Sequence, residues 1–264
     1  MENDYTRIWE GTETVVSILH SQAAVATQIL ITGKKHSASI LVDAGDGCLR
    51  DLVDREFIFD NLKGILFTHA HYDHCSGLFG LLSFLTVVCK KKKDLPIYTP
   101  SVCVEIERQL HLWRELYENR DLFKVNHYRI NPGETKSLSN FIFTAHEAAH
   151  PASETTSSVS DGIVQVPPSG ERGFLYDMQV GHEKVLICPD SGMDEKLFLH
   201  AEGADLALLE ATLPSENKRV GHIHMTESEA RSVGERASSH ILVHRGIKSG
   251  YFHKLTDENN KNND

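Results

Sequence analysis

The sequence predicts an α/β fold in which two β-sheets pack face to face and helices cover their outer surfaces. Strand-like segments follow one another in the N-terminal part, whereas strand-like and helix-like segments alternate further along the chain. A cluster of histidines stands directly behind one apolar segment, which places a candidate metal site at the end of a buried strand. Together these observations favour a sandwich with functional residues at its strand ends.

The expected strands are short runs rich in Val, Ile, Leu and Phe, bounded by small or polar turn residues. Early strands are expected at residues 15–20, 27–31 and 39–43, and another at residues 64–67. The later strands are expected at residues 96–98, 141–145, 174–178, 184–188, 207–210 and 241–244. The third and fourth of these later strands are expected to form a hairpin that turns at Gly181 and His182.

Helices are expected where apolar residues recur at helical spacing, at residues 77–88 and 102–117. A third helix should open at Thr226, because Glu229 stands three residues further on, which is the spacing of a capping box. Residues 152–170 are rich in Ser, Thr, Pro and Gly and predict a loop. That loop could be a lid over a functional site or a passive surface segment.

Length and composition fit one globular domain, which we expect over residues 1–255, followed by a frayed tail over residues 256–264. The 264 residues include 37 acidic and 27 basic side chains, which gives a formal net charge of −10. This acidic balance argues against a general nucleic-acid binder, although a local basic patch would not be excluded by it.

The chain is expected to be cytoplasmic and to have no membrane partner. No apolar run reaches the roughly 18 residues that a spanning helix needs, and the acidic start, Met1-Glu2-Asn3-Asp4, does not resemble a secretory signal. The five cysteines are odd in number and contain no Cys-x-x-Cys pair, which fits a reduced compartment. A homodimer stays an open alternative.

The most informative segment is the sequence from Thr68 to His74, which follows the apolar run at residues 64–67. Its metal-competent side chains are His69, His71, Asp73 and His74. In an extended chain His69, His71 and Asp73 would point to one side, and the turn would bring His74 beside them. Imidazoles combined with a carboxylate suit zinc, iron or manganese, and the lack of thiolates argues against a closed structural zinc site.

The pattern His-x-His-x-Asp-His behind an apolar strand resembles the metal motif of the metallo-β-lactamase superfamily. This resemblance implies an αββα four-layer sandwich with a hydrolytic centre of two divalent metal ions at one edge. Zinc is the expected metal, and manganese and iron stay open. Four residues cannot hold two ions, so further ligands are expected at later strand ends.

The resemblance implies three such ligands. His150 ends a strand-like segment and matches the third histidine of the first metal, with His146 on the same segment as its rival. Asp190 matches the bridging aspartate, although an aspartate there could also cap a helix, and His244 matches the last histidine of the second metal. The implied set is His69, His71 and His150 on one ion and Asp73, His74 and His244 on the other, with Asp190 between them. Asp43, in an Asp-x-Gly strand end, would orient a ligating imidazole.

Two further motifs resemble those of ribonuclease Z and its phosphodiesterase relatives. Glu210-Ala211-Thr212 follows an expected strand, and His224-Met225-Thr226 opens the capped helix. A histidine held by a carboxylate can keep a proton near neutral pH and give it to a leaving alkoxide. His224 with Glu210 is therefore the expected proton donor, Asp73 could orient the attacking water, and His222 is the rival of His224.

One departure from that branch concerns the substrate. Ribonuclease Z enzymes that process transfer RNA carry a long, basic, Gly-rich arm, and no stretch between His74 and His244 looks like one. The leading hypothesis is therefore a phosphodiesterase for a small cyclic or nucleotide-like substrate, with RNA as the less favoured partner. A thioester, lactone or β-lactam hydrolase on the same scaffold is the second hypothesis. A non-enzymatic metal-binding module is the third.

Overall fold

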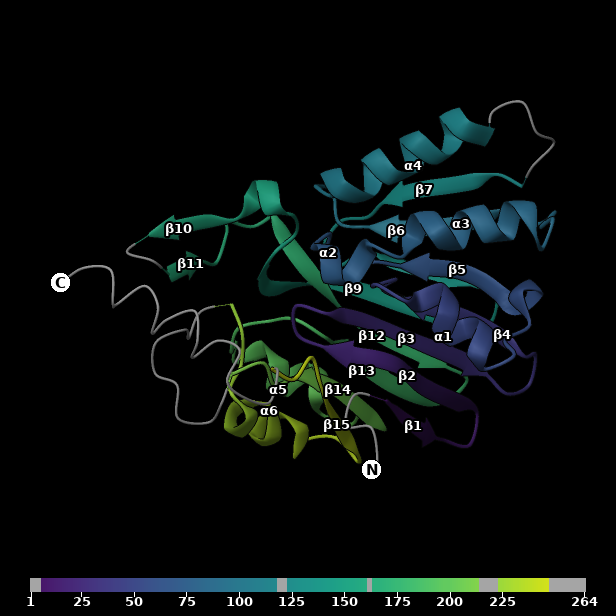
Figure 1. The fold of residues 1–264 in the computed structure, drawn as a ribbon. Helices are drawn as coiled ribbons and strands as arrows, with labels where there is room; N and C mark the ends of the chain where they lie inside the picture. The colour runs from purple at the N-terminus through teal and green to yellow at the C-terminus, as the bar shows by residue number, and fades with distance from the viewer. Residues whose placement is uncertain (1–5, 118–122, 161–162, 214–222, 247–264) are drawn as a thin grey trace.

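The computed structural model describes residues 6–117, 123–160, 163–213 and 223–246. Two large β-sheets lie face to face, with helices on both outer sides (Figure 1). The first sheet has seven strands in chain order: β1 (Arg7–Glu10), β2 (Thr14–Gln22), β3 (Ala26–Gly33), β4 (Ala38–Val42), β5 (Leu62–Leu66), β6 (Leu95–Thr99) and β7 (Val125–Arg129). Its pairs are antiparallel from β1 to β4 and parallel from β4 to β7.

The second sheet has six strands in the order β15-β14-β13-β12-β9-β8. Their bounds are β8 (Thr135–Leu138), β9 (Phe141–Pro151), β12 (Arg172–Val180), β13 (Glu183–Cys188), β14 (Leu206–Glu210) and β15 (His240–Val243). Strands β13, β14 and β15 run parallel, so their carboxyl ends meet at one edge of the sheet.

Helices α1 (Cys48–Asp54), α3 (Leu78–Val87) and α4 (Val104–Tyr117) lie outside the first sheet, and α5 (Lys196–Ala201) and α6 (Glu227–Gly234) lie outside the second (Figure 1). Three short segments complete the described elements: α2 (Tyr72–Cys75) and the 3-10 helices η1 (Phe59–Asn61) and η2 (Glu154–Thr156). A ribbon of β10 (Ser158–Ser160) and β11 (Ile163–Gln165) stands out from the sandwich.

Three apolar clusters fill the three spaces between the four layers. Neighbouring residues of a strand alternate between clusters, as the pleat requires. In β4, Ile40 packs between the sheets whereas Leu41 faces the helices, and in β13 Ile187 faces inward whereas Leu186 contacts the α5 side. The αββα four-layer sandwich expected from the sequence is thus confirmed.

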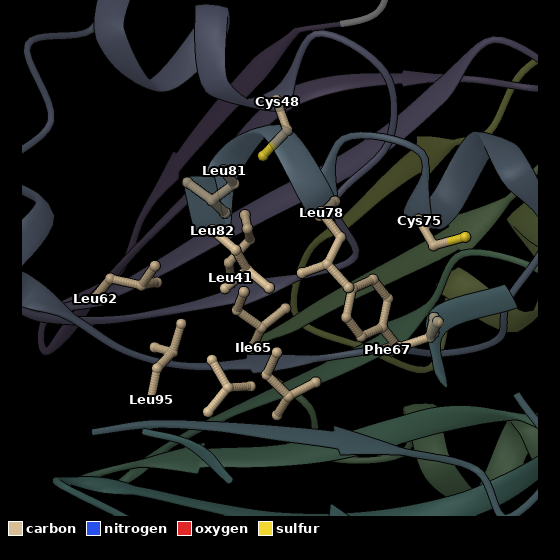
Figure 2. Packing of buried hydrophobic residues seen from close by; sticks show 14 of the residues in the cluster. Leu41, Cys48, Leu62, Ile65, Phe67, Cys75, Leu78, Leu81, Leu82 and Leu95 are labelled. Carbon is tan, nitrogen blue, oxygen red and sulfur yellow. The ribbon is translucent and has the colours of Figure 1, made fainter. Parts of the chain in front are cut away.

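Helix α3 shows how the outer layer is held. Leu78, Leu81, Leu82 and Leu85 recur at helical spacing and are fully buried. Figure 2 shows the first three of them facing the β-sheet residues Leu41 and Ile65. Removing one such leucine side chain costs roughly 2–5 kcal/mol, so this face of α3 fixes the helix above the sheet.

Most expected elements coincide with observed ones, including the hairpin of β12 and β13. The capping box at Thr226 is present, with its side chain accepting a hydrogen bond from the backbone of Glu229. The loop predicted over residues 152–170 is wrong in part, because η2, β10 and β11 form there. The expected tail at residues 256–264 lies outside the described residues. Within the described chain, no helix is long and apolar enough to cross a membrane.

Candidate metal centre

Strand ends of both sheets bring the predicted site residues to one edge of the sandwich. The segment with His69 and His71 follows β5 and leads into α2, which carries Asp73 and His74. From the second sheet come four more residues at or just beyond the ends of β9, β13, β14 and β15, namely His150, Asp190, Glu210 and His244. The parallel register of β13, β14 and β15 explains why the last three meet.

A close backbone contact fixes α2 against the first sheet. The amide of Ala44 donates to the carbonyl of His74 at 2.7 Å, and the amide of Gly77 donates to the carbonyl of Ala44 at 2.8 Å. A Cβ atom on Gly45 would lie 2.3 Å from the carbonyl oxygen of Asp73 and 2.7 Å from the amide nitrogen of Thr27. Only glycine allows this approach, which holds the metal motif in place.

His69, His71 and His150 form the first group of candidate ligands, with ligand atoms within 4.8 Å of one another. Their ring centroids are separated by 4.7 Å (69 to 71), 4.6 Å (69 to 150) and 4.9 Å (71 to 150). Since three imidazoles this close in a buried site must share a cation or stay neutral, the group is suited to a metal ion.

Asp73, His74 and His244 form the second group, and their candidate ligand atoms also lie within 4.8 Å of one another. Oδ2 of Asp73 lies 3.2 Å from Nε2 of His244 and 3.8 Å from Nε2 of His74. The amide of Ala24 donates to the same Asp73 oxygen at 2.9 Å. The carboxylate is therefore held by the protein on one side and faces the two imidazoles on the other.

Asp190 lies between the two groups. Its Oδ2 atom is 3.5 Å from Nε2 of each of His69, His74 and His150. Its Oδ1 atom is 2.9 Å from Nδ1 of His244. A carboxylate that touches both groups has the position of a bridge between two ions. It does not cap α5, which begins at Lys196.

Hydrogen bonds on the far nitrogens orient the imidazoles. Nδ1 of His74 donates to Asp43 at 2.8 Å, and Nδ1 of His69 lies 3.0 Å from the hydroxyl of Thr68, which itself donates to Asp43 at 2.8 Å. Nδ1 of His150 lies 3.1 Å from the carbonyl of Pro151. A proton on each Nδ1 leaves each Nε2 with a lone pair toward the centre.

The donor set fits divalent cations. The buried Nε2 atoms of His69, His71 and His74 have no hydrogen-bond partner among the described residues, an arrangement that costs free energy unless a further group binds there. Burial, with the neighbouring imidazoles, holds the pKa of His69 well below its usual range, so this ring is neutral. Burial raises the pKa of Asp73, but His74 and His244 outweigh burial and lower that pKa to about 2. The neutral form of His69 and the ionised form of Asp73 are the forms that bind a metal.

A histidine paired with a glutamate borders the centre. Nδ1 of His224 lies 2.9 Å from Oε1 of the fully buried Glu210, whose same oxygen accepts from the amide of Ser191 at 2.7 Å. The His224 ring lies 5.0 Å from that of His150 and is stacked 5.8 Å from that of His244. Burial lowers the pKa of His224, but the Glu210 carboxylate outweighs burial and raises it. The Glu210 carboxylate therefore favours the protonated form of the imidazole that faces the metal centre.

All nine predicted site residues lie together at this edge, whereas the rival His146 lies on the outer face of the second sheet against Asp177. The other rival, His222, lies outside the described residues. Sequence reasoning assigns no role to Thr68, which directly precedes the motif, or to Thr212, whose hydroxyl lies 2.8 Å from Nδ1 of His244. Glu154, in the segment expected as a loop, comes within 3.8 Å of His71.

Comparison with known proteins agrees with this geometry. A model of the β-lactamase superfamily domain matches residues 38–244. Ribonuclease Z of Bradyrhizobium sp. (strain ORS 278) is 26% identical over an alignment that covers 80% of this chain and 81% of that protein. The short form of human tRNase Z superposes with a TM-score of 0.69 at 21% identity, covering 88% of this chain and 93% of that one. The metallo-β-lactamase fold protein YhfI of Bacillus subtilis superposes with a TM-score of 0.68 at 18% identity, and the superposition covers 94% of this chain and 92% of that one.

Proposed function

The chain belongs to the metallo-β-lactamase superfamily, in its ribonuclease Z-like branch, and is a metal-dependent hydrolase. From this premise we propose that it cleaves a phosphodiester bond in a small cyclic or nucleotide-like substrate. The observation that carries the proposal is the contact between His224 and Glu210 beside the metal centre, at 2.9 Å. This pair supplies what phosphodiester cleavage needs beyond metal ions, a proton for the leaving oxygen.

We assign two ions, with zinc the metal best suited to the donor set, to the two groups described above. His69, His71 and His150 would hold one ion, Asp73, His74 and His244 the other, and Asp190 would bridge them. When bound, such ions polarise phosphoryl oxygens and lower the pKa of a water molecule toward neutrality. The remaining chemistry falls to the side chains of this chain.

In the proposed reaction, the oxygen of water forms a new bond to phosphorus, and the bond from phosphorus to the leaving oxygen breaks. The proton that the water loses passes to solvent, from which His224 is protonated again. The Asp73 carboxylate would orient the attacking water, since the amide of Ala24 fixes one of its oxygens. His224 would give its proton to the leaving oxygen, and the Glu210 carboxylate would balance the charge of the imidazolium. General acid catalysis of this kind contributes roughly 10²–10⁴-fold in rate.

The substrate is proposed to be small because the segment that follows His150 offers no basic side chain to a long RNA. Residues 152–170, which follow His150 and form the projecting ribbon, contain no Lys or Arg. The chain as a whole carries a net charge of −10. Binding of folded RNA draws most of its affinity from basic contacts to phosphates, so a small diester fits better.

A ribonuclease Z-like RNA endonuclease is the second candidate, because relatives that this chain matches over about four fifths of their length carry that name. A thioester or lactone hydrolase on the same scaffold is the third, although such a reaction has less need of the pair formed by His224 and Glu210.

A substrate panel tests the proposal. The zinc-loaded protein is assayed on bis(4-nitrophenyl) phosphate, a 2′,3′-cyclic nucleotide, a thioester, a lactone and precursor transfer RNA, with an Asp73→Asn preparation as the control for contaminating hydrolases. We expect turnover of the diesters and poor cleavage of the RNA. Turnover of the thioester or lactone without any diester would overturn the proposal. Efficient, salt-sensitive trimming of the RNA would replace it with the ribonuclease function.

A further inference from the structure

Three metal-competent side chains outside the proposed centre meet on the outer face of the second sheet, beneath α5. His146 stands opposite Leu175 in the register of β9 and β12, and Asp177 stands two residues beyond Leu175 on the same face. Leu175 packs in the outer cluster with Leu197 of α5, so this face looks toward the helix. From the last turn of α5, His200 completes the group.

The three side chains converge on one oxygen atom. Nε2 of His146 lies 3.1 Å and Nδ1 of His200 lies 2.9 Å from Oδ2 of Asp177. The two imidazole centroids are 4.3 Å apart with planes inclined by 50°. The candidate ligand atoms of all three lie within 4.8 Å of one another.

We propose that His146, Asp177 and His200 bind a divalent transition-metal ion, Zn²⁺ in the first instance, in addition to the ions of the metal centre. Two imidazole nitrogens and one carboxylate oxygen are a ligand set that zinc accepts. Tetrahedral zinc with bonds of about 2.0 Å separates its ligand atoms by roughly 3.3 Å. The observed separations of 2.9 and 3.1 Å from Asp177 are only a few tenths of an ångström shorter.

The charge and exposure of the group suit an exchangeable ion. Although burial raises it, the hydrogen bonds from His146 and His200 lower the pKa of Asp177 to about 2, so the carboxylate is ionised at neutral pH. The side chains of His146, Asp177 and His200 are 29%, 40% and 18% exposed, which leaves a path for the ion and a coordination position open to water. An ion would displace the protons that now lie between the nitrogens and the carboxylate.

A pocket of about 200 Å³ adjoins the group and is lined in part by both histidines. Two carboxylates, Glu147 and Asp194, also line it, together with the cations of Arg172 and Lys196. The open position of the ion would face this pocket, where a carboxylate or a water molecule could complete the coordination.

Binding would tie α5 to two strands of the sheet. Helix α5 has only six residues, and short helices depend on tertiary contacts for their stability. A bound ion would therefore protect the amides of α5 from hydrogen exchange. If the same three side chains were joined by hydrogen bonds alone, the hydrogen-exchange protection of the α5 amides would not depend on zinc.

Zinc content distinguishes the two arrangements, and the Asp190→Ala background separates this site from the metal centre. Protein of each variant is dialysed against Zn²⁺ and then analysed for metal. We expect one zinc equivalent fewer in His200→Ala than in the parent, both in the wild-type and in the Asp190→Ala background. The matched control, His111→Ala, removes an exposed histidine of α4 that pairs with Glu115, and it should lose none.

Hydrogen exchange of α5 with and without Zn²⁺ gives a second measurement that does not require the variants to be fully stable. Protection that rises on addition of Zn²⁺ in the wild type, and stays unchanged in His146→Ala, supports the site. Equal zinc content in the parent and in His200→Ala would overturn the proposed site. So would hydrogen-exchange protection of α5 that does not change when Zn²⁺ is added to the wild type.

Discussion

The carboxylate of Asp43 lies 2.8 Å from Nδ1 of His74, and both side chains are fully buried. The same carboxylate accepts from the amide and the hydroxyl of Thr68, each at 2.8 Å. One side chain at the end of β4 therefore orients the imidazole of His74 directly and that of His69 through Thr68.

Replacing this carboxylate should weaken metal binding without touching a ligand. In Asp43→Asn we expect the affinity for Zn²⁺ to fall about 10–100-fold, because the amide cannot hold the imidazole of His74 as a charged acceptor does. The affinity is measured by competition with a chromophoric chelator. Asp46→Ala, an exposed aspartate in the same turn, is the matched control and should bind normally. Wild-type affinity in Asp43→Asn would contradict the orienting role.

Substitution of Gly45 should disturb the metal motif through the backbone. A Cβ atom there meets the carbonyl oxygen of Asp73 at 2.3 Å, so Gly45→Ala must displace α2 and should lose about 1–3 kcal/mol of unfolding free energy. Gly80→Ala is the matched control, since nothing lies within 4 Å of its added Cβ. In helix α3 that change should stabilise by roughly 0.5–1 kcal/mol. Urea denaturation of both variants measures the difference, and equal stabilities would argue against the close contact.

Removal of metal should lower the stability of the protein that retains Asp190 more than that of a variant without this carboxylate. Each ion that binds only the folded state adds about 2.7 kcal/mol when free metal exceeds its dissociation constant 100-fold. Chelator treatment should therefore lower the melting temperature of the His200→Ala protein, which keeps only the proposed centre. Asp190→Ala in that background should bind less metal and respond less to the chelator. Identical metal content with and without Asp190 would rule out the bridged arrangement.

The sequence predicted elements whose signals are local. Short runs of apolar residues marked strands such as β4 and β13, and the pair of Thr226 and Glu229 marked the start of α6. The ribbon of β10 and β11 was missed, because each strand has only three residues, too few to show a periodic pattern, and the residues of β10 are exposed. The pairing of such short segments depends on backbone hydrogen bonds, which leave little trace in composition.

The candidate site depended more on resemblance than on pattern. Residue spacing alone could not separate His150 from His146, because both stand on β9 at even spacing. The register of β9 against β12 shifts between Glu147 and Pro151, which sends His150 to the edge and leaves His146 under α5. Likewise, Glu210 and His224 come from a strand end and a helix-opening turn, and only the fold brings them to 2.9 Å.

The most direct test of the central claim compares two substrates in the His224→Ala variant. A diester with an alkoxide leaving group needs a proton, whereas one with a nitrophenolate leaving group does not. With metal content unchanged, we expect kcat to fall roughly 10²–10⁴-fold on the alkoxide substrate and to change little on the nitrophenolate substrate. Full activity on the alkoxide substrate, or an equal loss on both substrates, would contradict the account.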